Sequence, residues 1–357
     1  MKLIHCSDIH LDSKMESNLS PKQARERKGE LCAAFSRLVQ YARENGVTAV
    51  LIAGDLFDSA RISAKTAGFV LDAIKSAPEV DFLYLRGNHD ESEKAFSGKE
   101  LPENLKFFSE NWTYYDYDGV TVAGIEPAPD GWQTMYAQLE LSPERTNIVL
   151  LHGQESSQTG DELVCLNALR GKNIRYLALG HLHGYKKAPL DLEGVYCYCG
   201  CLEGRGFDEC GEKGFVLLET GDTGVRTTFV PFAKRTLHEI GVDISGLTSV
   251  TELVRSMEDA AKDVPETDMV KFLLRGTYTL ETQKDLPFLL QMLENRFYFS
   301  KIKDESKLKI EKETYEHDIS LKGAFVRMVM ASALEDADKE QIICCGIQAL
   351  SGEEIGL

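Results

Sequence analysis

Five short segments of the chain combine aspartate, asparagine and histidine in patterns that suit metal binding. They hold five of the eight histidines of the sequence. The segments are Asp8-Ile9-His10, Gly54-Asp55-Leu56-Phe57-Asp58, Gly87-Asn88-His89-Asp90, His152-Gly153 and Gly180-His181-Leu182-His183. Carboxylate and imidazole ligands suit Mn²⁺, Fe or Zn²⁺, whereas Ca²⁺ prefers oxygen ligands alone. The segments therefore predict one site that holds more than one metal ion.

Each segment directly follows an apolar run that is typical of a buried strand. The runs are Leu3-Ile4, Ala49 to Ala53, Phe82 to Leu85, Ile148 to Leu151 and Tyr176 to Leu179. In an open α/β sheet the strand ends converge on one crevice, where ligands bind. One such segment alone would usually be an ordinary turn or a core histidine. Five in order, each behind its own strand, favour a shared site.

The residue types also predict how the site works. Two metal ions can clamp the attacking and leaving oxygens of a phosphoryl displacement, and such a pair needs a bridging carboxylate. Asp55 is the candidate, because Gly54 lets the backbone turn sharply at the strand end. His89 is expected to protonate the leaving oxygen, and Asp58 to hold its tautomer.

The remaining pattern predicts an α/β fold over residues 1–232. Strands alternate with helices, including a helix from Pro21 to Asn45, and a hairpin turns at Asp118-Gly119. Mixed strands with helices around them indicate two sheets packed face to face, with helices outside.

Two further parts are expected after this domain. Residues 233–312 show a β-α-β-α pattern and predict a small α+β domain. Residues 313–357 predict two amphipathic helices with a turn near Asp336-Ala337-Asp338. These helices either pack on their own domain or bind a partner.

Composition limits the class of protein. The 357 residues are 43% hydrophobic and carry a net charge of −17, which argues against a basic nucleic-acid coat protein. A nuclease is not excluded, because bound cations and local patches set the field at a cleft. The chain starts with a strand-like run and has no apolar run of membrane length, so neither a secretory signal nor a membrane span is expected. Its nine cysteines favour a reducing, cytoplasmic location.

Several residues allow two interpretations. Cys197, Cys199, Cys201 and Cys210 could suggest zinc, but the first three alternate along a strand, which favours small buried side chains. Arg25 and Lys28, with their neighbours Lys22 and Arg27, could contact DNA phosphates or form a solvated helix face. Arg205 could clamp a phosphate or pair with Glu203 or Asp208.

Taken in order, the five segments resemble the calcineurin-like metallophosphoesterase superfamily. The resemblance implies an α/β/β/α sandwich and two divalent metal ions, with Mn²⁺ favoured and Fe or Zn²⁺ as alternatives. One metal would take Asp8, His10, Asp55 and His183. The other would take Asp55, Asn88, His152 and His181. Family roles agree with His89 as the acid and Asp58 as its partner.

Within the superfamily, the chain is similar to the SbcD-type DNA repair exonucleases. The segment from Cys199 to Glu209 and the tail from Leu321 to Arg327 resemble the YhaO-type branch, and 233–312 would be its capping domain. This resemblance implies a DNA exonuclease or endonuclease subunit that works with an SbcC-type coiled-coil ATPase bound by the C-terminal helices, with a homodimer as a further expectation. Some relatives have histidine at the position of Asp58.

Two alternatives stay open. A phosphatase or cyclic-nucleotide phosphodiesterase of the same superfamily is one, although Ser59-Ala60 and Asp90 differ from the protein-phosphatase motifs. A DNA-end binding scaffold with a vestigial site is the other.

Overall fold

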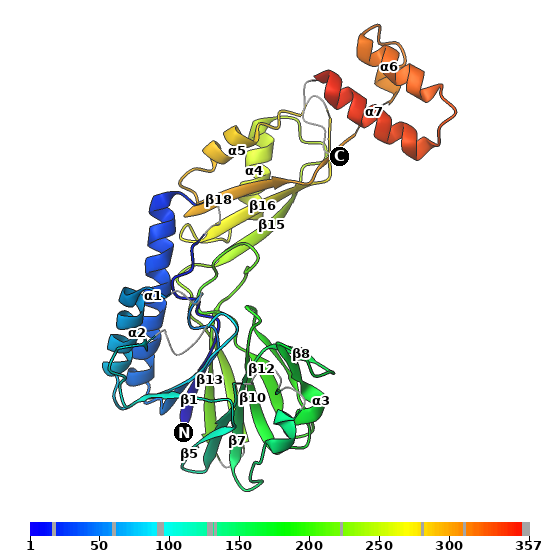
Figure 1. Cartoon of the computed structure of the whole chain (residues 1–357). Coiled ribbons are helices and arrows are strands. Elements are labelled where there is room, and N and C mark those ends of the chain that lie inside the picture. Colours follow the sequence, from blue (N-terminus) through cyan, green and yellow to red (C-terminus); the bar gives the residue numbers. More distant parts are fainter. Residues whose placement is uncertain are drawn as a thin grey trace. The chain divides into compact units, whose positions relative to one another are not determined.

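The computed structural model describes residues 1–15, 19–58, 62–90, 96–126, 131, 134–221, 224–279, 282–309 and 312–351. Ser59 and Ala60, which bear on the phosphatase alternative, lie outside these ranges. The chain divides into two compact units, Met1–Leu237 and His238–Leu357 (Figure 1). The three-part division predicted above stays a prediction.

The first unit contains a six-stranded sheet with the order β14-β13-β1-β2-β3-β4. Its strands are β1 (Lys2–Cys6), β2 (Ala49–Ala53), β3 (Asp81–Leu85), β4 (Leu105–Phe107), β13 (Gly214–Gly221) and β14 (Gly224–Pro231). Strands β1, β2 and β3 run parallel, with Ile4 opposite Val50 and Val50 opposite Phe82. Their carboxyl ends therefore meet at one edge of the sheet.

A second six-stranded sheet has the order β11-β12-β10-β7-β6-β5. Its strands are β5 (Thr113–Tyr117), β6 (Val120–Gly124), β7 (Thr146–His152), β10 (Ile174–Gly180), β11 (Lys186–Pro189) and β12 (Val195–Tyr198). Strands β7 and β10 are parallel, with Leu151 opposite Leu179. The predicted hairpin is confirmed, since β5 and β6 pair antiparallel around Asp118 and Gly119.

The two sheets pack face to face through a shared apolar core. Leu51 and Leu83 of the first sheet join Ile148 and Leu150 of the second in one buried cluster. Helices α1 (Pro21–Glu44) and α2 (Ala64–Lys75) cover the outer face of the first sheet, with Phe35 fully buried there (Figure 1). The outer face of the second sheet carries smaller elements: β8 (Gln154–Ser156), β9 (Leu163–Cys165), the 3₁₀ helix η2 (Met135–Gln138) and α3 (Leu166–Leu169). This arrangement confirms the predicted α/β/β/α sandwich.

Helix α1 illustrates how local sequence starts an element. Ser20 accepts a hydrogen bond from the Gln23 backbone, Gln23 reciprocates with its side chain, and Pro21 occupies the first turn. This capping box satisfies backbone donors that a helix start leaves without partners. The apolar stripe of the helix then faces the sheet.

The second unit has a three-stranded sheet of order β15-β16-β18, formed by β15 (Leu237–Asp243), β16 (Met269–Arg275) and β18 (Phe299–Asp304). Leu253 and Leu289 of helices α4 (Val250–Ala260) and α5 (Leu286–Met292) pack in one core with Phe272 of β16. Two short strands, β17 (Thr277–Tyr278) and β19 (Lys307–Leu308), pair in parallel. The β-α-β-α pattern predicted for this region is confirmed.

The chain continues through the 3₁₀ helix η3 (Lys312–Tyr315) to the helices α6 (Leu321–Met330) and α7 (Asp336–Ser351). Val326 and Val329 pack against Ile343 and Ile347 in a small cluster. The turn predicted near Asp336 to Asp338 is wrong by a few residues, because Asp336 is the first residue of α7. Acidic residues are favourable in a first helical turn, where they face the positive end of the helix dipole.

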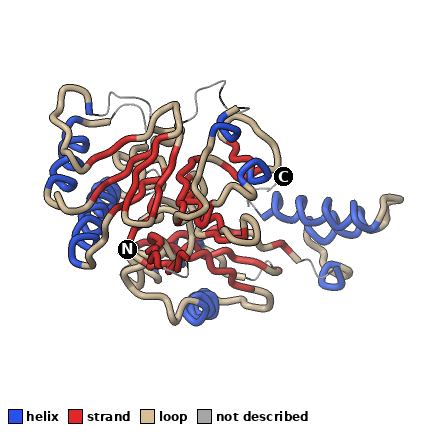
Figure 2. The backbone as a smooth tube through the Cα atoms, turned by 90° about the horizontal axis from the view of Figure 1, so that it is seen from below, coloured by secondary structure: helices blue, strands red, loops and turns tan. Residues whose placement is uncertain are grey.

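Figure 2 traces the whole chain by secondary structure, with strands in red and helices in blue.

Candidate metal centre

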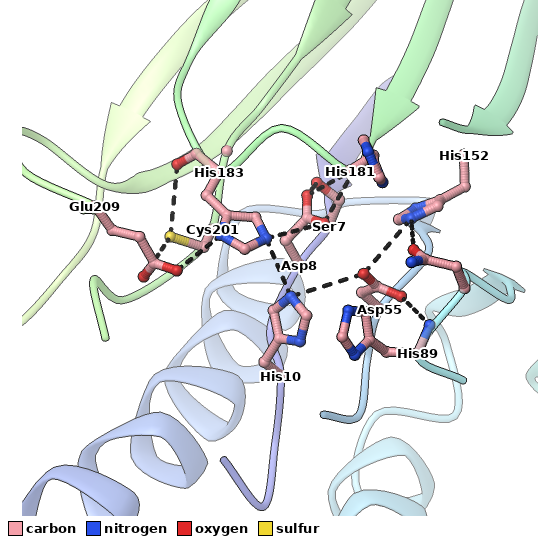
Figure 3. Close-up of polar contacts among 12 residues, drawn as sticks. Ser7, Asp8, His10, Asp55, His89, His152, His181, His183, Cys201 and Glu209 are labelled. Carbon is pink, nitrogen blue, oxygen red and sulfur yellow. Dashed lines mark hydrogen bonds and ion pairs between the residues drawn. The ribbon is translucent and has the colours of Figure 1, made fainter. Parts of the chain in front are cut away.

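The segments that follow β1 and β2 are joined by backbone hydrogen bonds just beyond the strand ends. The Asp8 N–H donates to the Gly54 carbonyl and the His10 N–H donates to the Asp55 carbonyl, each at a distance of 3.0 Å. These bonds extend the parallel pairing of β1 and β2 into the loops. The candidate ligands therefore lie on a rigid sheet edge (Figure 3).

Asp55 lies at the centre of the cluster. Its Oδ2 is 3.7 Å from His10 Nε2 and 3.5 Å from His152 Nε2, while Oδ1 accepts a 3.0 Å hydrogen bond from the His89 backbone. The carboxylate is 2% exposed. A shared ligand requires this position between two groups of donors.

The first group contains Asp8, His10 and His183, whose ligand atoms lie within 4.8 Å of one another. His10 Nε2 and His183 Nε2 face each other at 3.2 Å, and Asp8 Oδ1 is 3.9 Å from His183 Nε2. Asp8 is held in place because both its oxygens accept from the His181 backbone N–H.

The second group contains Asp8, Asp55 and His152, again within 4.8 Å of one another. His152 Nδ1–H donates to the Ala53 carbonyl at 2.9 Å, which directs Nε2 towards Asn88 Oδ1 at 3.0 Å. The ring centroid of His181 is 5.5 Å from that of His152, with the two rings perpendicular. Asn88 and His181 thus lie beside this group.

The electrostatics of these donors fit a bound cation. Burial raises the pKa of Asp8 to about 7 and lowers that of His152 to about 4. Burial also lowers the pKa of His10. The Nε2 atoms of His10 and His183 lie 3.2 Å apart, close enough for both to serve as ligands of one cation. A divalent cation supplies the charge that these buried carboxylates need.

Four of the candidate ligands have an unusual backbone conformation. Asp8, His10, Asp55 and His181 have φ angles of 50°, 48°, 52° and 105°. Such conformations cost about 1–3 kcal/mol each for residues other than glycine, and they cluster at functional sites. The strain is consistent with a backbone shaped for ligand placement.

Two glycines allow the strand ends to approach this closely. A Cβ at Gly87 would lie 2.2 Å from Asp55 Oδ1, and one at Gly180 would lie 1.8 Å from the Ala53 carbonyl oxygen. Neither position tolerates a side chain without displacing the loop after β2.

His89 and Asp58 lie close together, but their contact differs from the expected one. The exposed His89 ring is 5.2 Å from the His10 ring, and His89 Nδ1 is 3.4 Å from the backbone carbonyl of Asp58. The Asp58 carboxylate instead lies 3.1 Å from His10 Nδ1. Asp58 therefore meets His89 through its backbone and His10 through its side chain, and its role towards His89 stays a prediction.

Arg205 lies in the site, with partners that the sequence did not suggest. Its guanidinium donates to Asp58 Oδ1 at 2.7 Å and to Glu209 Oε1 at 2.8 Å. A pairing with Glu203 or Asp208 stays a prediction. Glu209 in turn accepts from His183 Nδ1 at 2.7 Å. Burial would raise the pKa of Glu209, but the hydrogen bonds from His183 and Arg205 outweigh it and lower this pKa to about 2. Glu209 is therefore an ionised acceptor, and the proton lies on His183 Nδ1.

Glu209 is the residue of this site that sequence analysis missed. It lies 26 positions beyond His183, in a stretch with no strand to mark its direction. The available signal was its place in the segment from Cys199 to Glu209 that carried the family resemblance.

The basic residues of α1 divide into two sets. Arg25 and Lys28 are exposed, and within the part of the chain that the structure describes neither pairs with a residue of the metal centre. Arg27 is buried instead, where it donates to the Gly204 carbonyl and pairs with Glu30. A DNA contact by Arg27 is therefore wrong, while those of Arg25 and Lys28 stay predictions.

The cysteines behave as packing residues. Cys197, Cys199 and Cys201 are buried free thiols. Strand β12 ends at Tyr198, so only Cys197 lies within it, and the predicted strand through Cys199 and Cys201 is wrong. Among the described residues, the groups that could hold a metal include none of these cysteines.

A groove next to Asn88 and His152 is strongly acidic. Glu110, Asp161 and Glu162 line it, together with Glu126, which pairs with Arg86. This side of the centre repels anions.

A family model described as calcineurin-like phosphoesterase matches residues 1–185. The metallophosphoesterase YhaO of Bacillus subtilis (strain 168) is 26% identical over 297 residues, which cover 78% of this chain and 72% of that protein.

Two archaeal proteins are also similar. The DNA double-strand break repair protein Mre11 of Sulfurisphaera tokodaii is 28% identical over 53% of this chain and 51% of its own length. The protein of the same name from Saccharolobus solfataricus is 25% identical over 64% of this chain and 63% of its own length. The chain thus spans between half and two thirds of the length of these two relatives.

No helix among the described residues is long and apolar enough to cross a membrane.

Proposed function

The chain belongs to the calcineurin-like phosphoesterase family and is a metal-dependent hydrolase, and from this premise we propose that it is a two-metal nuclease that hydrolyses phosphodiester bonds in DNA. The observation that carries the proposal is that residues from five strand ends lie together. Asp8, His10, Asp55, His152 and His183 belong to groups that could hold a metal, and Asn88 and His181 lie beside His152. The choice of DNA is supported by similarity to proteins named for double-strand break repair.

The donors divide into two ligand sets that share Asp55. Asp8, His10 and His183 would complete one, and Asn88, His152 and His181 the other. When bound, two divalent ions orient the attacking and leaving oxygens of the phosphodiester and neutralise charge in the transition state. Mn²⁺ suits this mixture of oxygen and nitrogen donors, with Fe and Zn²⁺ as alternatives.

His89 is placed to act on the leaving group. It lies in the loop after β3, its backbone is fixed by the hydrogen bond to Asp55, and its imidazole is exposed beside the His10 ring. An exposed imidazole at the rim can donate a proton to the departing sugar oxygen. His89 is therefore the proposed general acid.

The charges around the centre give the substrate a direction of approach. The acidic groove beside Asn88 and His152 disfavours a polyanionic strand there. The loop after β1 leads along the chain to α1, whose Arg25 and Lys28 are exposed. We propose that the DNA backbone follows the α1 side, where these two residues contact phosphates.

The helices α6 and α7 are the proposed binding site for a coiled-coil ATPase of the SbcC type. Leu321 and Met328 of α6 are 71% and 67% exposed, and Ile342 of α7 is 39% exposed. Exposed apolar side chains on a helical pair are typical of a surface that binds another helix. We also propose that two such complexes assemble through a homodimer of this chain.

A nuclease assay tests the function directly. The purified protein is incubated with Mn²⁺, Mg²⁺ or Zn²⁺ and defined single-stranded, blunt and hairpin DNA, with and without the ATPase. We expect Mn²⁺-dependent cleavage. Absence of cleavage on every substrate, with rapid turnover of a phosphoprotein or a cyclic nucleotide instead, would favour the phosphatase or phosphodiesterase alternative. Binding of DNA ends without any hydrolysis would favour the scaffold.

A further inference from the structure

Arg205 connects two carboxylates that face two different histidines of the centre. Its Nη1 donates to Asp58 Oδ1 at 2.7 Å, and its Nη2 donates to Glu209 Oε1 at 2.8 Å. The backbone N–H of Arg205 also donates to Glu209 Oε2 at 2.6 Å. One residue thus fixes both carboxylates at once.

Each carboxylate faces the Nδ1 atom of one histidine. Asp58 Oδ1 is 3.1 Å from His10 Nδ1, and Glu209 Oε1 accepts from His183 Nδ1 at 2.7 Å. The opposite nitrogens, the two Nε2 atoms, meet at 3.2 Å. A histidine whose Nδ1–H is held by a carboxylate presents Nε2 as the ligand atom, in a fixed ring orientation.

The two metal sets differ in this respect. His152 of the other set is oriented by a neutral acceptor, the Ala53 carbonyl. The Asp58–Arg205–Glu209 bridge therefore acts on one of the two ligand sets.

The environment of Arg205 also bears on whether it can clamp a substrate phosphate. Its side chain is 18% exposed, and its Nε, Nη1 and Nη2 atoms all donate to Asp58 or Glu209. Three of the five N–H groups of the guanidinium are thus committed to carboxylates by charge-assisted bonds, which hold the side chain in this orientation. Positioning of the histidines agrees better with this geometry.

We infer that Arg205 and Glu209 are positioning residues, which together with Asp58 hold His10 and His183 in the orientation needed to bind the first metal ion. This inference deepens the proposed function and rests on its two-metal centre. It reassigns Arg205 from a phosphate contact to a support of the ligands.

The test measures metal binding in the absence of DNA. Mn²⁺ is titrated into the metal-free protein, and binding is followed by calorimetry and by the electron paramagnetic resonance of free Mn²⁺. In Arg205→Met we expect one of the two dissociation constants to rise about 10- to 100-fold, which is the usual effect of losing a group that orients a metal ligand. The other constant stays within a factor of about three.

A matched control is Arg175→Met. Arg175 also pairs with a glutamate, Glu193 at 2.7 Å, but at the start of β10, the end of the strand opposite to His181. Both of its constants should equal those of the unaltered protein. Glu209→Gln keeps an acceptor for His183 and should lie between Arg205→Met and the unaltered protein.

Three outcomes decide the inference. Unchanged Mn²⁺ affinity in Arg205→Met, with a raised KM for a phosphodiester, would overturn it in favour of a phosphate clamp. If Arg205→Met does not fold, Asp58→Asn applies the same test at the His10 end, and unchanged affinity there overturns the inference equally. If the unaltered protein itself binds fewer than two Mn²⁺ ions, the two-metal centre fails, and the bridge fails with it.

Discussion

At the scale of residues, two histidines of the centre each have one ring nitrogen committed to the protein. His152 uses Nδ1 for a backbone carbonyl and His183 uses it for Glu209. The Nε2 atom of His152 is left to face Asp55, and that of His183 to face Asp8 and His10 Nε2. The protein therefore fixes tautomer and direction before a cation arrives, which lowers the entropic cost of binding it.

His89 should be needed for catalysis but not for metal binding. His89→Gln removes the proposed proton donor while the Asp55 contact, which uses the backbone N–H of residue 89, is kept. We expect kcat for DNA cleavage to fall about 10²- to 10⁴-fold. Mn²⁺ titration should still give two bound ions. Loss of an ion from this variant would show that His89 is a ligand.

His5 should make stability depend on pH. It is fully buried in β1, with Nδ1 2.8 Å from the Tyr176 hydroxyl, and burial lowers its pKa from 6.5 to about 3. Between these values the unfolded chain binds a proton that the folded chain does not, so stability is complete above about pH 6.5 and falls as the pH drops towards 3. The loss should reach roughly 3 kcal/mol at pH 4.

Urea unfolding at a series of pH values measures this effect. His5→Gln keeps a polar partner for Tyr176 but cannot take up a proton, so its stability should fall less between pH 7 and pH 4. Identical slopes for the two proteins would contradict a neutral buried His5.

At the scale of elements, the candidate ligands can be predicted from the sequence because each one directly follows a recognisable strand. A short apolar run followed by Asp, Asn or His gives both the strand and the point where it ends, as in Ala49 to Ala53 before Asp55. The sandwich follows from the same runs. Glu209 has no such marker, because it reaches His183 across a loop of irregular structure. The side-chain partner of Asp58 was missed for a similar reason. His10 and Asp58 are 48 residues apart in the sequence, and their contact depends on how two loops pack against each other.

The loops after β2 and β3 are joined by Asp90. Its carboxylate accepts from the backbone N–H groups of Leu56, Phe57 and Gly87, and it is 6% exposed. Asp90→Ala leaves three buried donors without this acceptor, which should lower the free energy of unfolding by roughly 3 kcal/mol. It should also weaken Mn²⁺ binding, because the same loops carry Asp55 and Asn88.

Asp90→Asn is the matched variant, since its amide oxygen can still accept. We expect it to lose less than half as much stability as Asp90→Ala in urea unfolding. Equal losses in both variants would show that the negative charge, and not the acceptor geometry, matters.

At the scale of the whole molecule, a net charge of −17 accompanies a function in which the substrate is an anion. The acidic groove beside Asn88 shows where part of this charge lies. The centre itself becomes attractive to phosphate once its carboxylates are neutralised by bound cations. DNA binding should therefore depend on the metal as well as on salt.

The helical pair α6 and α7 should carry partner binding separately from catalysis. Leu321→Glu combined with Met328→Glu places two charges on exposed apolar positions of α6. We expect binding to the coiled-coil ATPase to weaken at least about 100-fold by calorimetry, since buried unpaired charges are costly at an interface. Mn²⁺-dependent cleavage by the protein alone should be unchanged.

The control for this prediction is Leu192→Glu, at a fully exposed leucine in the loop between β11 and β12. It should bind the ATPase normally. Equal binding by the α6 variant and this control would place the ATPase contact elsewhere on the chain.

The most direct test of the two-metal centre is anomalous X-ray scattering from crystals that contain Mn²⁺, measured on both sides of the manganese absorption edge. We expect two peaks that share Asp55: one among Asp8, His10 and His183, and the other among Asn88, His152 and His181. A single peak, or peaks away from these residues, would contradict it.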